Sequence, residues 1–237
     1  MIKLENWEVV GWEHAIRGMR NPKNSWEKSD SKKVNSTFKW KELGPGCESL
    51  IQVPCDPYIS VGENDHDLMM RLRNAGTDHR KFMRMIVVYV DVTAPLYWWK
   101  EADTYKVGTV ANSCSTMHKI HEKEFVLSDF SYEHLIHNEP IPGRTFSARQ
   151  ALCVQMEILN MYRELFLEFE NKEYWWQMIQ LLPTSYNQKR TLMLNYEVLA
   201  NIYKSRKNHK LDEWHEFCAW IEKLPYSELI IGEKKDG

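Results

Sequence analysis

The sequence predicts an α+β domain with a twisted sheet flanked by long helices. Two segments carry this prediction: the β-branched, apolar run Met85–Val92 is typical of a buried strand, and the stretch from about Ala148 to Asn171 is typical of a long helix. With 237 residues, the chain is long enough to bury a substantial core. We expect one domain over residues 1–237, in which residues 22–63 form an irregular insertion or arm.

The first half of the chain contains the predicted strands. Residues 21–65 are rich in Lys, Ser, Asn, Pro and Gly, which favours irregular loops. A glycine just after a helical pattern marks its end, and a proline closes a strand. The expected elements are a strand and then a short turn or helix in 1–20, loops in 21–65, a helix over Asp65–Asn74 ending near Gly76, the strand Met85–Val92 closed by Pro95, and helices at Leu96–Tyr105 and Ser115–Lys123.

The second half of the chain is predicted to be helical. A proline- and glycine-containing loop at 138–147 precedes the long helix, and Pro183 breaks the pattern again. The expected helices are Ala148–Asn171, Lys172–Leu182, Lys189–Lys207 and Leu211–Leu224.

Composition excludes several classes of protein. The 31 basic and 33 acidic residues nearly cancel, which argues against a broad surface for nucleic acid or anionic lipid. No apolar run reaches the roughly 18 residues of a membrane span, and the first ten residues do not resemble a signal peptide. Five scattered cysteines are an odd number, so we expect reduced thiols and a cytoplasmic location. Two H-x-x-H pairs lack cysteines at finger spacing, and we predict no metal site.

The segment Asp91–Thr116 is the first candidate for a ligand site. A strand-like run ends at Pro95, and small and hydroxyl residues then gather around Gly108, with Lys106 just before them. Small residues allow close approach of a backbone to a ligand, and hydroxyls suit a phosphate or a polar ring. The alternative is an ordinary polar loop with a helix cap.

A second candidate pattern lies in the predicted helix Lys189–Lys207. Leu199, Ile202 and Arg206 share the helix face of Asn195. Asn195 and Arg206 would lie roughly 16 Å apart along this stripe, at about 1.5 Å per residue. Polar groups at both ends could hold an elongated ligand; alternatively, the stripe belongs to the core.

These two segments resemble two blocks of the flavin-dependent thymidylate synthases, over most of the span from about Thr77 to Pro225. In the first block, His79 precedes Ala94-Pro95 at the spacing expected for that family. In the second, Leu182-Pro183 is followed by Asn195 twelve residues after the proline, and by Arg206 eleven residues later. Leu199 stands at the position of a family leucine.

The chain departs from the family pattern at several charged positions. Thr104-Tyr105-Lys106 stands where the family has arginine-histidine-arginine. Glu197 and Ile179 replace two further arginines. The register beyond Thr109, whose hydroxyl replaces a family serine, has two alternatives. Without a gap, Ala111, Cys114 and Thr116 replace the family asparagine, serine and arginine; with one extra residue, Asn112 and Ser115 match the first two and Met117 replaces the arginine.

The resemblance implies a mainly antiparallel sheet and a homotetramer with active sites between subunits. It also implies methylation of dUMP, or of a related pyrimidine nucleotide, with methylenetetrahydrofolate as carbon donor, reduced FAD as hydride donor and NADPH as the reductant of the flavin. The residues that it assigns to the cofactor are His79, Lys106 and Asn195. Those that it assigns to the substrate are Thr109, Asn112, Ser115 and Arg206. Trp98 or Tyr105 would stack on a ring or serve the core.

Two functions therefore stay open from the sequence. The first is an FAD-dependent methyltransferase of the thymidylate synthase type, in which no catalytic side chain is assigned. The second is a non-catalytic protein that kept the fold and binds a nucleotide. The retained His79, Asn195 and Arg206 favour the first, and the lost arginines favour the second.

Overall fold

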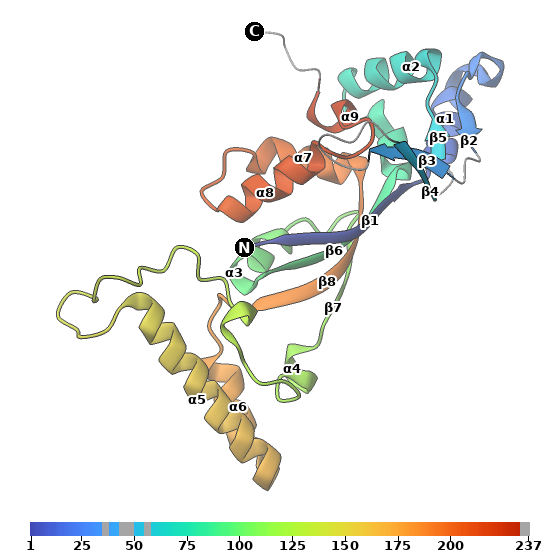
Figure 1. Ribbon diagram of the computed structural model, residues 1–237. Helices are drawn as coiled ribbons and strands as arrows, with labels where there is room; N and C mark the ends of the chain where they lie inside the picture. The colour runs from blue at the N-terminus through green and yellow to red at the C-terminus, as the bar shows by residue number, and fades with distance from the viewer. Residues whose placement is uncertain (35–37, 43–49, 55–57, 233–237) are drawn as a thin grey trace.

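The centre of the molecule is a four-stranded antiparallel sheet with the strand order β1-β6-β8-β7 (Figure 1). The computed structural model describes residues 1–34, 38–42, 50–54 and 58–232. The strands of this sheet are β1 (Lys3–Val10), β6 (Val87–Pro95), β7 (Val110–Ser113) and β8 (Asn187–Asn195). The mainly antiparallel sheet expected from the resemblance is confirmed.

The side chains of strand β6 show that one face of the sheet is buried and the other is open. Val88, Val90, Val92 and Ala94 are buried, while Tyr89 between them is exposed. Successive side chains of a strand point to opposite faces, so the valines mark the core face. The predicted strand Met85–Val92 is confirmed, with bounds shifted by a few residues.

Helices cover the core face of the sheet, which confirms the α+β class. The main apolar core joins the sheet to residues of α1, α2, α3, α7, α8 and α9. The helices of the described residues are α1 (Trp12–Arg20), α2 (Glu63–Asn74), α3 (Leu96–Ala102), α4 (Thr116–Lys119), α5 (Ala148–Phe169), α6 (Lys172–Leu181), α7 (Tyr196–Arg206), α8 (Asp212–Ile221) and α9 (Glu228–Ile231).

A second apolar core lies between α5, α6 and the loop after α4. Its buried residues are Ile120, Phe125, Phe130, Leu152, Leu159 and Met178. Figure 1 shows the α5–α6 hairpin extending away from the sheet. The predicted helices Ala148–Asn171 and Lys172–Leu182 are both confirmed, and Ser147 begins the first by accepting a hydrogen bond from the Gln150 backbone N–H (3.2 Å).

The predicted helix Lys189–Lys207 is wrong in its first third. Residues up to Asn195 form β8, and the helix α7 begins at Tyr196. The run from Lys189 to Asn195 alternates, with Leu192 and Leu194 buried on the core face. β8 is paired on both sides, with β6 and β7, and this cross-strand hydrogen bonding outweighs any local helix preference.

The prediction of irregular loops over 21–65 also needs correction. β2 (Lys32–Val34) pairs with β5 (Tyr58–Ser60), β3 (Phe38–Glu42) pairs with β4 (Leu50–Pro54), and α2 already begins at Glu63. Both pairs are antiparallel. Whether residues 22–63 are an insertion or arm stays a prediction, as does the single domain.

Four other segments differ from the sequence-based expectation to different degrees. The helix expected over Leu96–Tyr105 ends at Ala102, and that expected over Ser115–Lys123 is the single turn α4. The hydroxyl-rich segment after Gly108 is not only a turn, because Val110–Ser113 forms the edge strand β7. The predicted helix Leu211–Leu224 is observed as α8.

In the described part of the chain, no helix combines the length and apolar character of a membrane span. The cysteines that the structure describes, Cys114, Cys153 and Cys218, are free thiols, and burial raises the pKa of Cys218 to about 11. Cys47 and Cys55 lie outside the described residues.

A buried carboxylate holds the N-terminal segment onto the helices. Asp65, at the start of α2, forms an ion pair with the buried Arg20 of α1 (2.6 Å). Its other oxygen accepts hydrogen bonds from the hydroxyls of Ser29 (2.7 Å) and Ser31 (2.6 Å). Burial alone would raise the pKa of Asp65, but the serine hydroxyls and Arg20 hold it below its usual range.

We predict that Asp65→Ala lowers the free energy of unfolding by about 3–5 kcal/mol, because it leaves the buried Arg20 without its counter-ion. Urea denaturation measures this loss. Asp67→Ala, at an exposed position of the same helix, should change stability by less than about 0.5 kcal/mol. Equal effects of the two substitutions would show that the buried pair contributes little.

Candidate functional site

The pairing of β6 with β8 brings the two sequence blocks together. In their register, Pro95 lies opposite Asn187 and Val87 lies opposite Asn195. The first residue of β6 therefore lies beside the last residue of β8. Just beyond this pair, the Tyr196 backbone N–H donates to the carbonyl of Ile86 (3.0 Å). The candidate site lies around this junction, at the start of α7.

The chain returns from α3 to the sheet through Tyr105–Thr109, which we call the Gly108 turn. Gly108 has a φ of +79°, and a Cβ there would lie 2.9 Å from Asn195 Nδ2 and 3.1 Å from Val198 Cγ2. Asn195 also caps α7, since its Oδ1 accepts from the Val198 backbone N–H (3.0 Å). The absence of a side chain at Gly108 is what lets the turn lie on the first turn of α7.

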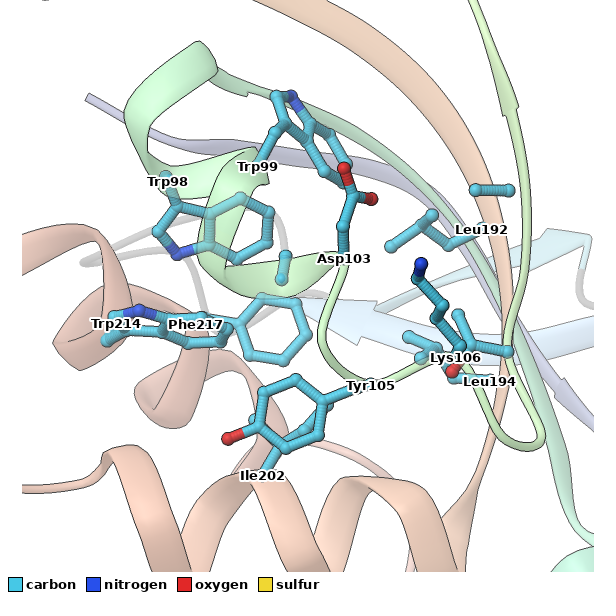
Figure 2. Close-up of a pocket in the computed structure, with 13 residues that line it drawn as sticks. Trp98, Trp99, Asp103, Tyr105, Lys106, Leu192, Leu194, Ile202, Trp214 and Phe217 are labelled. Carbon is cyan, nitrogen blue, oxygen red and sulfur yellow. The ribbon is translucent and has the colours of Figure 1, made fainter.

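An aromatic cavity of about 120 Å³ lies beneath this turn (Figure 2). Its aromatic walls come from α3, the Gly108 turn and α8, and its aliphatic part comes from β8 and α7. Its lining includes Trp98, Tyr105, Lys106, Thr109, Trp214 and Phe217. We refer to it as the aromatic cavity.

The aromatic walls pack against one another. The Trp98 ring centroid is 4.7 Å from that of Trp214 and 5.6 Å from that of Phe217. The Trp98 indole nitrogen and the Thr109 hydroxyl are buried and have no hydrogen-bond partner within the described residues. In Figure 2 the indole nitrogen lies on the side of Trp214. Thr109 and Trp98 therefore each bring one buried, unsatisfied donor to the residues that line the cavity.

The mouth of the aromatic cavity is positively charged. Lys106 and Asp103 are both exposed there. Asp103 is neutralised by Arg190 (2.7 Å), whose guanidinium lies 4.2 Å from the Trp99 ring centroid. Lys106 forms no ion pair within the part of the chain that the structure describes. An anionic group would therefore meet an uncompensated ammonium.

Arg206 lies at the other end of α7, where it is held by the protein. Its Nη1 pairs with Glu101 (2.8 Å), and its Nε donates to the Tyr105 hydroxyl (2.9 Å). The guanidinium also lies 4.9 Å from the ring centroid of Trp214. Glu101 thus neutralises the cation that the sequence assigned to the substrate.

The apolar stripe between Asn195 and Arg206 belongs to the core. Leu199 and Ile202 are buried, and the Gly108 turn contacts both ends of α7, through Gly108 at Asn195 and through Tyr105 at Arg206. The alternative that the stripe belongs to the core agrees with this burial, and the elongated ligand stays a prediction.

Glu197, which the sequence comparison marked as a departure, lies on the first turn of α7. The carboxylate pairs with Arg80 (3.3 Å) and Arg84, both from the 3₁₀ helix Arg80–Met85 that follows His79. Burial alone would raise the pKa of Glu197, but the two arginines hold it below its usual range. Asp78 also interacts electrostatically with Arg84, so two guanidiniums and two carboxylates meet at this place.

The open face of the sheet carries a polar row across three strands. Asn112 of β7 lies opposite Thr191 of β8, which lies opposite Asp91 of β6. Hydrogen bonds from Thr191 (2.7 Å), Asn6 (3.0 Å) and Lys189 (3.1 Å) lower the pKa of Asp91 to about 2. Since side chains alternate along β7, Asn112 is on this face while Ala111 lines the cavity on the other.

The remaining predicted residues lie apart from the cavity. His79 is exposed ahead of the 3₁₀ helix, and Ser115 caps α4 by accepting from the His118 backbone N–H (3.0 Å). The structure therefore groups Lys106, Thr109 and Asn195 at the Gly108 turn, places His79 on the segment that leads into the Glu197 pairs, and leaves Asn112 and Ser115 elsewhere. Among the described residues there is no group of three or more potential metal ligands.

Sequence reasoning missed the α8 side of the site. Trp214 and Phe217 line the cavity, and Trp214 Nε1 donates to Glu101 (2.9 Å). The only signal in the sequence was the high number of tryptophans, ten in all. The position of Trp214 and Phe217 in the C-terminal part of the chain does not indicate that they contact α3. Trp98, with 1% of its surface exposed, is a core residue as well as a cavity wall.

Comparison with solved structures identifies the fold. Thymidylate synthase X (ThyX) from Helicobacter pylori, crystallised with FAD and dUMP, matches with a TM-score of 0.61 and 15% identity, over 97% of this chain and 96% of that chain. A second complex of this enzyme, described as flavin-dependent, matches at 0.58 and 15%, over 96% and 95%. The chain has the fold of the flavin-dependent thymidylate synthases.

A third solved structure broadens the comparison. The UMP/dUMP methylase PolB from Streptomyces cacaoi, bound with 5-Br UMP, matches with a TM-score of 0.56 and 12% identity, over 94% of this chain and 90% of that chain. No protein-family model matches the chain, and no curated protein matches it by sequence. At this level of identity, the likeness establishes the shared fold of the ThyX-like proteins.

We predict that Gly108→Ala lowers the free energy of unfolding by about 1–3 kcal/mol, since it adds backbone strain and a contact with Asn195. Gly143→Ala is a matched control, because Gly143 has a φ of +75° and nothing within 4 Å of its Cβ position. Urea denaturation of both variants isolates the contact at Asn195. Equal losses would mean that the Gly108 turn does not depend on this close approach.

Proposed function

We propose that this protein is a ThyX-like methyltransferase that methylates dUMP, or a related pyrimidine nucleotide, with methylenetetrahydrofolate and reduced FAD. The observation that supports this most is the match over nearly the whole chain to two FAD and dUMP complexes and to a UMP/dUMP methylase. All three bind a uracil nucleotide or its analogue. The two sequence blocks at the β6–β8 junction agree with it.

The charges at the start of α7 fit an anionic cofactor. The family arginine is lost at Glu197, but Arg80 and Arg84 bring two guanidiniums to the same place. The first turn of α7 adds the positive end of its dipole. We propose that His79, Lys106 and Asn195 hold the flavin, around the backbone approach that Gly108 permits.

The substrate would lie beside the flavin. We propose Thr109, Asn112, Ser115 and Arg206 as substrate contacts. Two of the five N–H donors of Arg206 are already bound, by Tyr105 and Glu101, so the two of Nη2 and one of Nη1 remain for this purpose. A bound reduced flavin supplies a hydride, methylenetetrahydrofolate the carbon and NADPH the electrons that restore the flavin. The side chains bind and orient the reactants, and none is proposed as a catalytic nucleophile.

The second candidate is a nucleotide-binding protein that no longer catalyses methylation. The ion pair of Arg206 with Glu101 favours it, because a neutralised guanidinium binds a phosphate less well. The near-neutral net charge supports small molecules as partners in both cases. A cytoplasmic location remains a proposal.

The colour of the purified protein separates the two candidates. For the methyltransferase, we expect the absorption spectrum of bound flavin, or uptake of added FAD, and conversion of dUMP to dTMP with methylenetetrahydrofolate and NADPH. Nucleotide binding without FAD uptake would favour the second candidate.

We predict that Lys106→Ala raises the Kd of dUMP or FAD roughly 10- to 150-fold, since a charged hydrogen bond contributes about 1.5–3 kcal/mol.

Lys100→Ala is the control, because Lys100 is exposed on the adjacent helix α3 and does not line the cavity. Equal Kd values for Lys106→Ala and Lys100→Ala would contradict the assigned role of Lys106. A wild-type protein that binds neither a nucleotide nor FAD would contradict both candidate functions.

We further propose a homotetramer with sites between subunits, supported by the projecting α5–α6 hairpin (Figure 1). Large apolar side chains are exposed along it, which is typical of a protein interface. They are Val154, Met161, Leu167, Phe169, Trp176 and Leu181.

Light scattering after gel filtration tests this assembly. We expect a tetramer for the wild type, and dissociation to smaller species for Met161→Glu, whose methionine is 60% exposed. Glu157→Gln, at another exposed position of α5, should keep the wild-type mass. A wild-type monomer would contradict the assembly.

A further inference from the structure

We propose that Glu101 is a specificity-determining residue, whose carboxylate fills an anion-binding position at the C-terminal end of α7 and keeps the phosphate of a ligand out of it. This inference rests on the proposed nucleotide-binding function and deepens it. Arg206 has a carboxylate of its own chain as partner, and Lys106 is left as the cation that an external anion meets.

Three nitrogen atoms converge on one oxygen of Glu101. Arg206 Nη1 donates to Oε2 (2.8 Å), Trp214 Nε1 donates to the same oxygen (2.9 Å), and His209 Nε2 lies 3.3 Å from it. A guanidinium and an indole N–H can only donate hydrogen bonds, so they are also groups that bind a phosphate or carboxylate oxygen from solution. These nitrogens therefore form an anion-binding position, and Glu101 occupies it.

Two aromatic side chains hold the guanidinium in this position. Its central carbon lies 4.9 Å from the ring centroid of Trp214 and 5.5 Å from that of Tyr105. The Arg206 Nε also donates to the Tyr105 hydroxyl (2.9 Å). The stacking and the hydrogen bond orient Arg206 toward Glu101, so the position keeps its shape when the carboxylate is changed.

Solvent reaches this position mainly at Glu101. The Glu101 side chain is 34% exposed, whereas those of His209 and Arg206 are 23% and 17% exposed. Removal of the carboxylate would therefore open the three nitrogens to an anion from solution.

Glu101 competes well with an external anion. The fold already holds its carboxylate in place, whereas a phosphate from solution must lose its translational freedom on binding. A phosphate beside Glu101 would also meet a like charge. In Figure 2, the Tyr105 hydroxyl, which Arg206 contacts, points away from Lys106. A phosphate is therefore directed to Lys106 and away from Arg206.

Glu101→Gln tests the specificity, because glutamine keeps an oxygen that accepts from Arg206 and Trp214 while it removes the charge. We expect its Kd for dUMP to fall about tenfold or more, the effect of one charge-assisted hydrogen bond. The Kd for deoxyuridine, which has no phosphate, should stay unchanged. Glu157→Gln removes an equal charge from an exposed position of α5 and should change neither Kd. Calorimetric titration measures both ligands.

Chemical rescue gives a readout that needs no nucleotide. Glu101→Ala should lower Tm, and acetate or inorganic phosphate should restore Tm in part, relative to sodium chloride at equal ionic strength. Phosphate should also raise the Tm of Glu101→Gln more than that of the wild type. Glu222→Ala is the matched control, because Glu222 accepts from the Tyr203 hydroxyl (2.6 Å) and forms no ion pair among the described residues. The anions should not restore its Tm.

The outcomes separate this inference from the proposed function. Rescue of Glu101→Ala by acetate or phosphate supports the anion-binding position even in a protein that binds no dUMP. Equal effects of the anions on Glu101→Ala and Glu222→Ala overturn it. A wild type that binds dUMP with a Kd that Glu101→Gln does not lower overturns the role of Glu101 in specificity and leaves nucleotide binding intact. FAD uptake and turnover decide the methyltransferase separately.

Discussion

The antiparallel pairing of β6 with β8 is the constraint on which the rest of the structure depends. These strands are about a hundred residues apart in the chain, and their register places Val87 opposite Asn195. Because α7 leaves β8 where the 3₁₀ helix enters β6, Arg80 and Arg84 reach Glu197 across this junction. A register shift of one residue would exchange the faces of every side chain and separate these partners.

The sheet divides the hydroxyl-rich segment between two surfaces. Thr109 and Ala111 line the aromatic cavity on the core side, whereas Asn112 joins the row of Thr191 and Asp91 on the open side. Residues that are adjacent in the sequence therefore serve different environments. One surface is aromatic and enclosed, and the other is polar and available for further contacts.

Charge is distributed unequally along α7. At its first turn, Glu197 pairs with Arg80 and Arg84, and the positive end of the helix dipole lies at the same turn. At its last turn, Glu101 neutralises Arg206 and also accepts from Trp214. Lys106, which is unpaired among the described residues, lies on the Gly108 turn, whereas the guanidinium of Arg206 is already neutralised.

The sequence by itself determined the buried strand Met85–Val92, the long helices that became α5 and α6, and the spacing of Pro183, Asn195 and Arg206, because these depend on local composition and order. It could not determine that Lys189–Asn195 is a strand, since that segment owes its conformation to hydrogen bonds with β6 and β7. Lys106 and Thr109 were found as candidates from their neighbours in the chain. Only the tertiary structure decided that Trp214 joins them and that Glu101 holds Arg206, because such contacts join residues about a hundred positions apart and leave no local pattern.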